Sequence, residues 1–338
     1  MKNFKSLLFS SFVLMVGCGG GNGDTNNTTQ PNGDTGNTTQ PQETIKTQEE
    51  ARAIVAGFFG VLDFGESIRD TGDVMIQMNR DKGFGFHKKL LDIYKYTANR
   101  NSLTVLQSNQ EYKCPEGGNY TIQEIGNLSY EITFRNCISL GTTIEGVFII
   151  SAIDENNNEN PEELTFTLKQ GFSIESTDSA FKANGDFTLS MKGFNNGDLF
   201  DSSGNIKGDL TYQGGPIRIE DKEENKWEEI KFNSFLVKLD EANGTVSFSG
   251  ELTYKDNFCK TNPVSLYFNT PQEFKHSYVA FCPYAGKLSI NNGLITIEAY
   301  DPDKNPETEN YMKVYFNNTE IFNDICTKFS PPQSCGGG

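Results

Sequence analysis

The sequence predicts a mainly β protein with a large antiparallel meander sheet, as a barrel, half-barrel or sandwich, with two N-terminal helices and stapled hairpins. Three observations support this fold class. Phe (26) and Tyr (13) are frequent beside 33 glycines, a mixture that favours strands and turns. From Ser102 onward, short alternating stretches are separated by Gly, Asn and Asp turns at roughly 8–12-residue intervals, as in antiparallel sheets. Two pairs of cysteines flank candidate hairpins.

The first residues have the layout of a secretory signal. Lys2 and Lys5 precede an apolar run from Leu7 to Val16, and small Gly17 comes directly after it. The run is too short to span a bilayer as a helix of the mature protein. Residues 1–17 are therefore predicted to be a signal peptide, and the chain is predicted to be exported.

The end of this segment, Leu14-Met15-Val16-Gly17-Cys18, resembles a bacterial lipobox, with Met15 where leucine is commonest. The resemblance implies that Cys18 is diacylated and becomes the first residue of the mature protein, with palmitate among its acyl groups. Since Gly19 and not Asp comes after the cysteine, it also implies the outer membrane, without deciding between its periplasmic and surface faces. An ordinary cleaved signal with an incidental cysteine is the alternative.

Residues 18–43 are expected to be a flexible tether behind this anchor. They contain two near-copies of one polar decapeptide, "NGDTNNTTQP" and "NGDTGNTTQP". Such Gly-, Asn- and Thr-rich sequence cannot bury a core and stays extended and solvated.

Residues 44–100 are expected to form a helical segment that packs on the sheet. Thr47 and Glu50 are spaced as a capping box at a helix start. The next residues place apolar side chains on one helical face, namely Ala51, Ile54, Val55, Phe58, Phe59 and Leu62.

A second helix is predicted at about residues 84–97, where Leu90, Leu91 and Tyr94 are apolar. His87 lies within it. We interpret this histidine as a surface or capping residue, because a metal site needs several protein ligands and this histidine is a lone candidate.

The β-rich domain is predicted to cover residues 101–338, and its cysteines are expected to be oxidised after export. Cys114 and Cys137 bracket two strand-like runs, "YTIQEI" and "LSYEITF". A three-residue turn at 125–127 would place Ile122 opposite Tyr130, and a bulge at Gly117-Gly118 would bring the cysteines into step. We therefore predict a hairpin stapled by a Cys114–Cys137 disulfide.

A second pair, Cys259 and Cys282, has the same spacing. The stretch "NTPQ" at its midpoint is a plausible type I turn, so a Cys259–Cys282 disulfide is predicted to staple a second hairpin. Cys326 and Cys335 are predicted to close the C-terminal tail loop. Zinc sites and cysteine nucleophiles are disfavoured, since the chain has no C-x-x-C and only two histidines.

The two cysteine stretches, each with the strands after its second cysteine, resemble a family of uncharacterised β-rich exported proteins and lipoproteins of Gram-negative bacteria. The matching segments are "CPEGG", "TFRNC", "IEG" and "AGKLSINNGLITIEA", spread over most of residues 110–320. The resemblance implies two related hairpin units, at about 112–160 and 257–305. It transfers no catalytic residues.

Two acidic turns suggest calcium ligands. Asp154, Asn156 and Asn158 form one D-x-[DN]-x-N pattern, and Asp301, Asp303 and Asn305 form the other. This spacing presents oxygens at three positions of a calcium loop, but Gly at position 6 and Glu at position 12 are missing from both. We therefore interpret them as plain turns, with calcium binding as the alternative.

The functional hypothesis is a lipid-anchored cell-envelope protein with a non-enzymatic β-rich binding or structural domain. A net charge of −16 argues against nucleic acid, no recognised catalytic motif is present, and no cofactor is expected. The membrane, through the lipid, and an unknown envelope or surface partner are the expected contacts. The alternatives are a lipid or lipoprotein carrier with an apolar half-barrel cavity and a calcium-dependent surface adhesion module.

Overall fold

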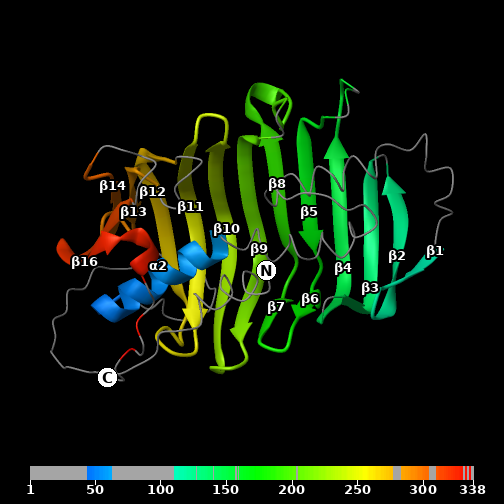
Figure 1. Ribbon diagram of the computed structural model, residues 1–338, viewed down its shortest axis with the longest axis horizontal. Helices are drawn as coiled ribbons and strands as arrows, with labels where there is room; N and C mark the ends of the chain where they lie inside the picture. Colours follow the sequence, from blue (N-terminus) through cyan, green and yellow to red (C-terminus); the bar gives the residue numbers. More distant parts are fainter. Residues whose placement is uncertain are drawn as a thin grey trace, which may run out of the picture.

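The computed structural model describes residues 44–62, 110–126, 128–139, 141–156, 158, 160–202, 205–276, 283–303, 310–329, 332 and 335. Its strands form one 16-stranded antiparallel sheet in the order β1-β2-β3-β4-β5-β8-β9-β10-β11-β12-β13-β14-β15-β16, with β6 and β7 joined beside this path (Figure 1). The predicted mainly β fold with a large antiparallel sheet is therefore confirmed.

The helices and strands are short to medium in length and cover most of the described chain. The helices are α2 (Gln48–Leu62) and the 3₁₀ turns η2 (Phe194–Asn196) and η3 (Cys326–Lys328). The first strands are β1 (Gln110–Lys113), β2 (Gly117–Gly126), β3 (Ser129–Ser139), β4 (Thr142–Ile153), β5 (Glu163–Leu168), β6 (Ser173–Glu175), β7 (Ser179–Ala183) and β8 (Phe187–Gly193). The remaining strands are β9 (Lys207–Asp221), β10 (Lys226–Asp240), β11 (Thr245–Asp256), β12 (Val264–Lys275), β13 (Ala285–Ile290), β14 (Ile295–Tyr300), β15 (Tyr311–Phe316) and β16 (Thr319–Ile325).

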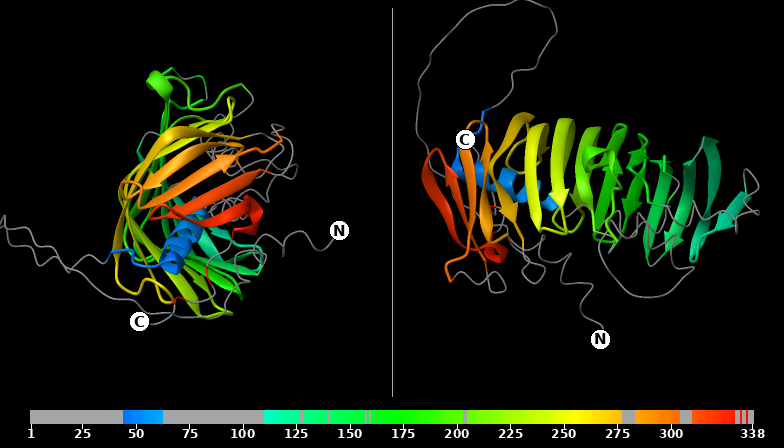
Figure 2. Two further views of the ribbon diagram at one scale, coloured as in Figure 1. Left: turned by 90° about the vertical axis from the view of Figure 1, so that its left-hand side faces the viewer. Right: turned by 90° about the horizontal axis from the view of Figure 1, so that it is seen from above.

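One face of the sheet is apolar along nearly its whole length. Every second residue is buried in most strands, as in β5, β8 and β14, because successive side chains of a strand point to opposite faces. Seen along the row of strands, the sheet curves, and α2 lies on its concave side (Figure 2, left). We call this apolar side the inner face. The 112–160 stretch holds β2–β4 and the 257–305 stretch holds β12–β14, toward opposite ends of the same sheet.

The helix packs on the part of the inner face formed by β10, β11 and β12. The ring of Phe58 contacts those of Phe235, Phe248 and Phe268, with centroids 6.0, 5.4 and 4.6 Å apart. Ala51, Ile54 and Val55 are fully buried, which confirms the predicted apolar side of this helix over residues 51–58. The side chains of Phe59 and Leu62, the other predicted members, are outside the described part of the structure. The second predicted helix, at 84–97, lies outside the described residues, so one of the two expected helices is present in the described part of the chain.

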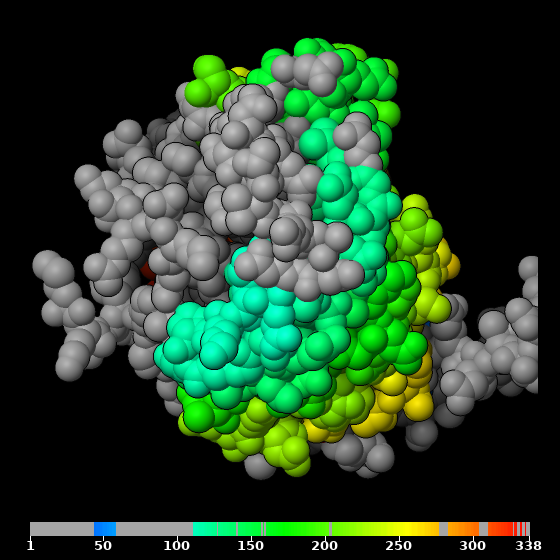
Figure 3. Space-filling model, turned by 90° about the vertical axis from the view of Figure 1, so that its right-hand side faces the viewer, coloured from blue at the N-terminus to red at the C-terminus, as the bar shows by residue number. Residues whose placement is uncertain are grey.

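Toward the other end of the sheet, Phe172 packs on the inner face from the turn between β5 and β6. Its ring lies 6.3 Å from those of both Phe134 and Phe148, measured between centroids. The space-filling view from the β1 end shows β1, β2 and β3 forming the near side of the molecule (Figure 3).

The first predicted hairpin is present, but in a different register. Ile122 pairs with Ile132, and Gly126 pairs with Ser129, so a two-residue connection replaces the predicted three-residue turn. Leu128 in this connection has φ 50°. The predicted bulge is confirmed, since the register shifts between Gly117 and Asn119.

The second predicted hairpin is wrong. The stretch that was expected to turn at "NTPQ" is the middle of the continuous strand β12. Pro271 has no N–H to give to a ladder, and the pairing with β11 and β13 shifts register around it. Thr270 bridges the irregularity, since its Oγ1 bonds both the N–H and the carbonyl of Phe248, each at 2.8 Å. A strand with a bulge therefore tolerates the turn-like sequence.

Candidate functional site

A group of polar residues lies where the start of α2 meets the ends of β10 and β11, and it is the candidate site. The predicted capping box fixes the start of the helix. The N–H of Glu50 donates to Thr47 Oγ1 at 3.2 Å, and the N–H of Thr47 donates to Glu50 Oε2 at 3.4 Å. These bonds use donors that a helix start leaves without partners.

A buried lysine joins this helix start to the loop after β11. Lys260 is 1% exposed, and its Nζ lies 2.9 Å from Glu50 Oε1 and donates to the carbonyl of Thr44 at 3.0 Å. A buried cation is tolerated only when it is paired and hydrogen-bonded. The ion pair thus fixes the point where the N-terminal segment joins the sheet domain.

Next to this pair, two carboxylates and a phenol share the inner face. Tyr254 Oη donates to Asp256 Oδ2 at 2.9 Å. Asp256 Oδ1 accepts the N–H groups of Phe258, Cys259 and Lys260, which holds the loop against the end of β11. Glu228 is the direct cross-strand partner of Asp256 and hydrogen-bonds with Tyr254.

The electrostatics of this group are unusual because it lies under the helix. Burial, and then the charge of Asp256, raise the pKa of Glu228 from 4.5 to about 8, although the bond with Tyr254 lowers it. Burial and the two neighbouring carboxylates also raise the pKa of Tyr254 well above its ordinary value. Burial and the neighbouring carboxylate of Asp256 therefore favour the protonated form of Glu228.

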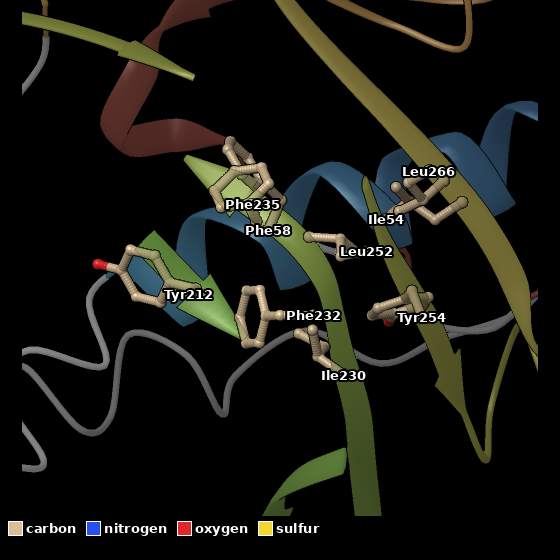
Figure 4. A pocket seen from close by; sticks show the side chains of 9 residues that line it. All are labelled: Ile54, Phe58, Tyr212, Ile230, Phe232, Phe235, Leu252, Tyr254 and Leu266. Carbon is tan, nitrogen blue, oxygen red and sulfur yellow. The ribbon is translucent and has the colours of Figure 1, made fainter. Parts of the chain in front are cut away.

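Between α2 and the sheet the packing is nearly complete. Nine residues enclose a cavity of about 10 Å³ (Figure 4), namely Ile54, Phe58, Tyr212, Ile230, Phe232, Phe235, Leu252, Tyr254 and Leu266. This space is at the lower limit for one water, and a water there would need polar partners. Burial raises the pKa of Tyr212 to about 12, so that phenol stays neutral.

The first predicted disulfide is present in the structure. Cys114 and Cys137 are bonded with their Cα atoms 5.4 Å apart, and the bond ties β3 to the segment just before β2. The predicted anchor, Cys18, lies outside the described residues, as does His87.

The other two predicted disulfides are wrong. Cys259 is bonded to Cys335, with Cα atoms 5.0 Å apart, so neither the predicted Cys259–Cys282 bond nor the predicted Cys326–Cys335 bond is formed. Cys326 is also disulfide-bonded. The physical reason is the continuous strand β12, which carries the chain away from Cys259 where a hairpin would have brought it back. The Cys259–Cys335 bond instead joins the chain end to the Lys260 loop.

The first acidic turn is held by its own side chains and by Asp198. The N–H of Asn158 donates to Asn156 Oδ1 at 2.9 Å, and the Asn156 and Asn158 amides donate to Asp198 at 2.9 and 3.0 Å. In the second turn, the N–H of Asp303 donates to Asp301 Oδ1 at 3.1 Å, while Asn305 lies outside the described residues.

Both turns show the local hydrogen bonding of plain Asx turns. Within the described ranges, no group of three or more His, Cys, Asp or Glu residues is placed to hold a metal ion. Calcium binding stays a prediction that titration calorimetry can test.

The sequence reasoning missed Glu228 and Asp256. A signal was present, because both residues occupy alternate positions of their strands that otherwise hold apolar side chains. Glu228 precedes Ile230 and Phe232 in such a series, and Asp256 comes after Leu252 and Tyr254. Acidic residues in an apolar series indicate a buried polar contact. Their pairing required the register of β10 against β11, which the sequence does not reveal.

The structure thus defines a mainly β protein with one large antiparallel sheet, two assigned disulfides and a buried polar cluster under a helix. No helix in the described part of the chain has the length and apolar character needed to cross a membrane. The chain is 35% identical over 271 residues to a protein of Aquifex aeolicus described as uncharacterized protein aq_aa17, covering 74% of this chain and 77% of that protein. It belongs to the same family. No family model matches the chain, and no solved structure matches it.

Proposed function

We propose that the protein is a lipid-anchored component of the bacterial cell envelope, held through Cys18, with a non-enzymatic β domain that binds or supports an envelope partner. The outer membrane is the proposed location. One observation carries the proposal: the N-terminal segment enters the domain at a built attachment point. Lys260 is bonded there to both Glu50 and the carbonyl of Thr44, and the adjacent Cys259 is bonded to Cys335.

This attachment suits a domain held on a tether. Chain tension at Thr44 would pull on a buried ion pair and a disulfide-linked loop, and not on a free helix end. The disulfides also agree with export to an oxidising compartment.

The close packing between α2 and the sheet favours a binding or structural role over catalysis at this place. The cavity of about 10 Å³ under α2 is too small for a substrate. The outer side of the sheet carries cross-strand pairs such as Lys287–Glu298 and Lys182–Glu220, at 2.6 and 3.0 Å, and offers a rigid polar surface to a partner.

Metabolic labelling with palmitate tests the anchor. The wild type should incorporate label and fractionate with outer membranes, whereas Cys18→Ser should lose both the label and the membrane association. A Cys335→Ser variant is the matched control, since it also loses one thiol and should keep the label. Unlabelled wild-type protein, or labelled Cys18→Ser, would contradict the proposal.

A lipid carrier is the second candidate, because the inner face is apolar across a sheet of 16 strands and curves around its helix. The small cavity under α2 weighs against a preformed lipid site there. Native mass spectrometry of the protein purified from membranes decides. A stoichiometric bound lipid that survives in Cys18→Ser favours the carrier, and its absence favours the filled domain.

A further inference from the structure

Glu228 and Asp256 form an acidic pair that cannot carry two charges without cost. They lie directly opposite each other on β10 and β11, and like charges in this relation destabilise a sheet. Asp256 is fully buried but accepts three backbone N–H groups and the Tyr254 hydroxyl, which stabilise its carboxylate. A proton bound by the pair therefore resides on Glu228.

Tyr254 contacts both carboxyl groups. Its hydroxyl has a single proton, which it donates to Asp256 Oδ2 at 2.9 Å. Its contact with Glu228 lowers the pKa of that carboxyl and so opposes protonation, but burial and the charge of Asp256 have larger effects on Glu228 and raise the pKa.

The helix closes over Glu228 and Tyr254 at Gly57. A Cβ at residue 57 would lie 3.0 Å from Glu228 Oε2 and 2.7 Å from Tyr254 Cε2. The backbone of α2 therefore lies directly against the carboxyl and covers part of its surface. Departure of the helix would hydrate Glu228 and return its affinity for a proton toward that of an ordinary glutamate.

The other groups packed around Glu228 do not remove its preference for the protonated form. On the β9 side its partner is apolar Ile219. Of the charges on α2 and the loop, Glu50 and Lys260 are bound to each other at 2.9 Å. Arg52 of α2 lies over the ring of Phe329, 5.7 Å from its centroid, and Glu49 is in the first turn of the helix. The neighbouring Glu229 has the opposite strand parity, and it pairs with Lys255 at 2.7 Å.

We propose that α2 and Glu228 form a proton-dependent latch, in which the helix lies on the inner face while Glu228 is protonated and is released more readily when that proton is lost. Proton binding and helix docking are linked reciprocally. Because the pKa of Glu228 is higher in the docked state, docking is strongest below about pH 4.5 and weakens as pH rises to about 8. Above that pH it changes no further, because Glu228 is then ionised in both states.

Release of α2 would uncover the aromatic residues that Phe58 contacts, Phe235, Phe248 and Phe268. The latch would thereby control access to this apolar part of the inner face. It does not depend on the identity of any envelope partner or on the lipid anchor.

Hydrogen exchange of the α2 amides tests the latch, after correction for the intrinsic pH dependence of exchange. Between pH 6 and pH 8 the opening of α2 in the wild type should increase roughly 50-fold, as expected for a carboxyl whose pKa shifts from 8 to 4.5 on opening. Amides of β4 (Thr142–Ile153) serve as the internal reference and should show no such change.

Two variants test whether the proton on Glu228 causes the pH dependence of α2 opening. Glu228→Gln replaces the titrating carboxyl by a neutral amide of nearly the same size and should make the opening of α2 independent of pH. Glu229→Gln, the neighbour on the opposite face, should retain the wild-type pH dependence. A pH-independent opening in the wild type, which needs no variant to fold, would overturn the proposal, as would a pH dependence that persists in Glu228→Gln.

Discussion

Among single residues, Lys260 has the greatest structural consequence. It is a cation at 1% exposure, bonded to the helix residue Glu50 and to the carbonyl of Thr44. Its backbone also takes part, since the N–H of Asp256 donates to the Lys260 carbonyl at 2.7 Å. One residue therefore connects the N-terminal segment, the helix and the end of β11.

Lys260→Met is expected to destabilise the fold by about 3 kcal/mol or more, because it leaves Glu50 buried without its partner. Urea unfolding followed by the fluorescence of Trp227 measures the change. Lys287→Met is the matched control: it breaks a partly exposed pair with Glu298 and should cost less than about 1 kcal/mol. Equal losses in the two variants would contradict the buried ion pair.

Among the elements, α2 combines a strong start with a close backbone contact. The capping box fixes its first turn, and Gly57 lets its backbone approach Tyr254 and Glu228. Glycine inside a helix costs about 1 kcal/mol relative to alanine. The sequence therefore accepts a weaker helix in return for closer docking.

Gly57→Ala separates these two effects. Helix propensity alone predicts a gain, but the added Cβ would lie 2.7 Å from Tyr254 Cε2, an overpacking that typically costs about 1–3 kcal/mol. We expect the contact to dominate and the exchange of the α2 amides to accelerate by roughly tenfold. Slower exchange of α2 would show that the ring moves aside without cost.

The Cys259–Cys335 disulfide is the second contact that holds elements together, since it joins the chain end to the Lys260 loop. Its ends are 76 residues apart, so in the chain-entropy picture its removal costs about 4 kcal/mol. Cys335→Ser should lose about this amount in urea unfolding. A non-reducing digest should yield linked peptides for Cys114–Cys137 and Cys259–Cys335, whereas a Cys259–Cys282 peptide would contradict the structure.

For the whole molecule, the sequence predicted the fold class, because strand alternation and turn residues are local signals. Residues such as Ile132 and Phe134 show their face by parity alone. The prediction of a Cys259–Cys282 disulfide failed because it assumed a turn at Pro271. Proline is typical of turns, yet the Thr270 side chain lets β12 continue past this position. The Glu228–Asp256 contact was hidden because it depends on the register of strands that are paired over a long hairpin.

The acidity of the whole chain leads to a last prediction. The net charge is −16, and self-repulsion of this size destabilises a compact state. Salt also weakens the attractive pairs on the outer side of the sheet, but exposed pairs contribute at most about 1 kcal/mol each. Since the Debye length falls from about 30 Å at 0.01 M to about 8 Å at 0.15 M, relief of the net repulsion should dominate.

The Tm at pH 7 is therefore expected to rise by about 2–4 °C between these two salt concentrations. Scanning calorimetry in NaCl measures the change, and KCl should give the same result if screening is the cause. A lower Tm at 0.15 M would mean that cross-strand pairs such as Lys182–Glu220 outweigh the repulsion. The stability of the sheet would then depend on the placement of its charges more than on their sum.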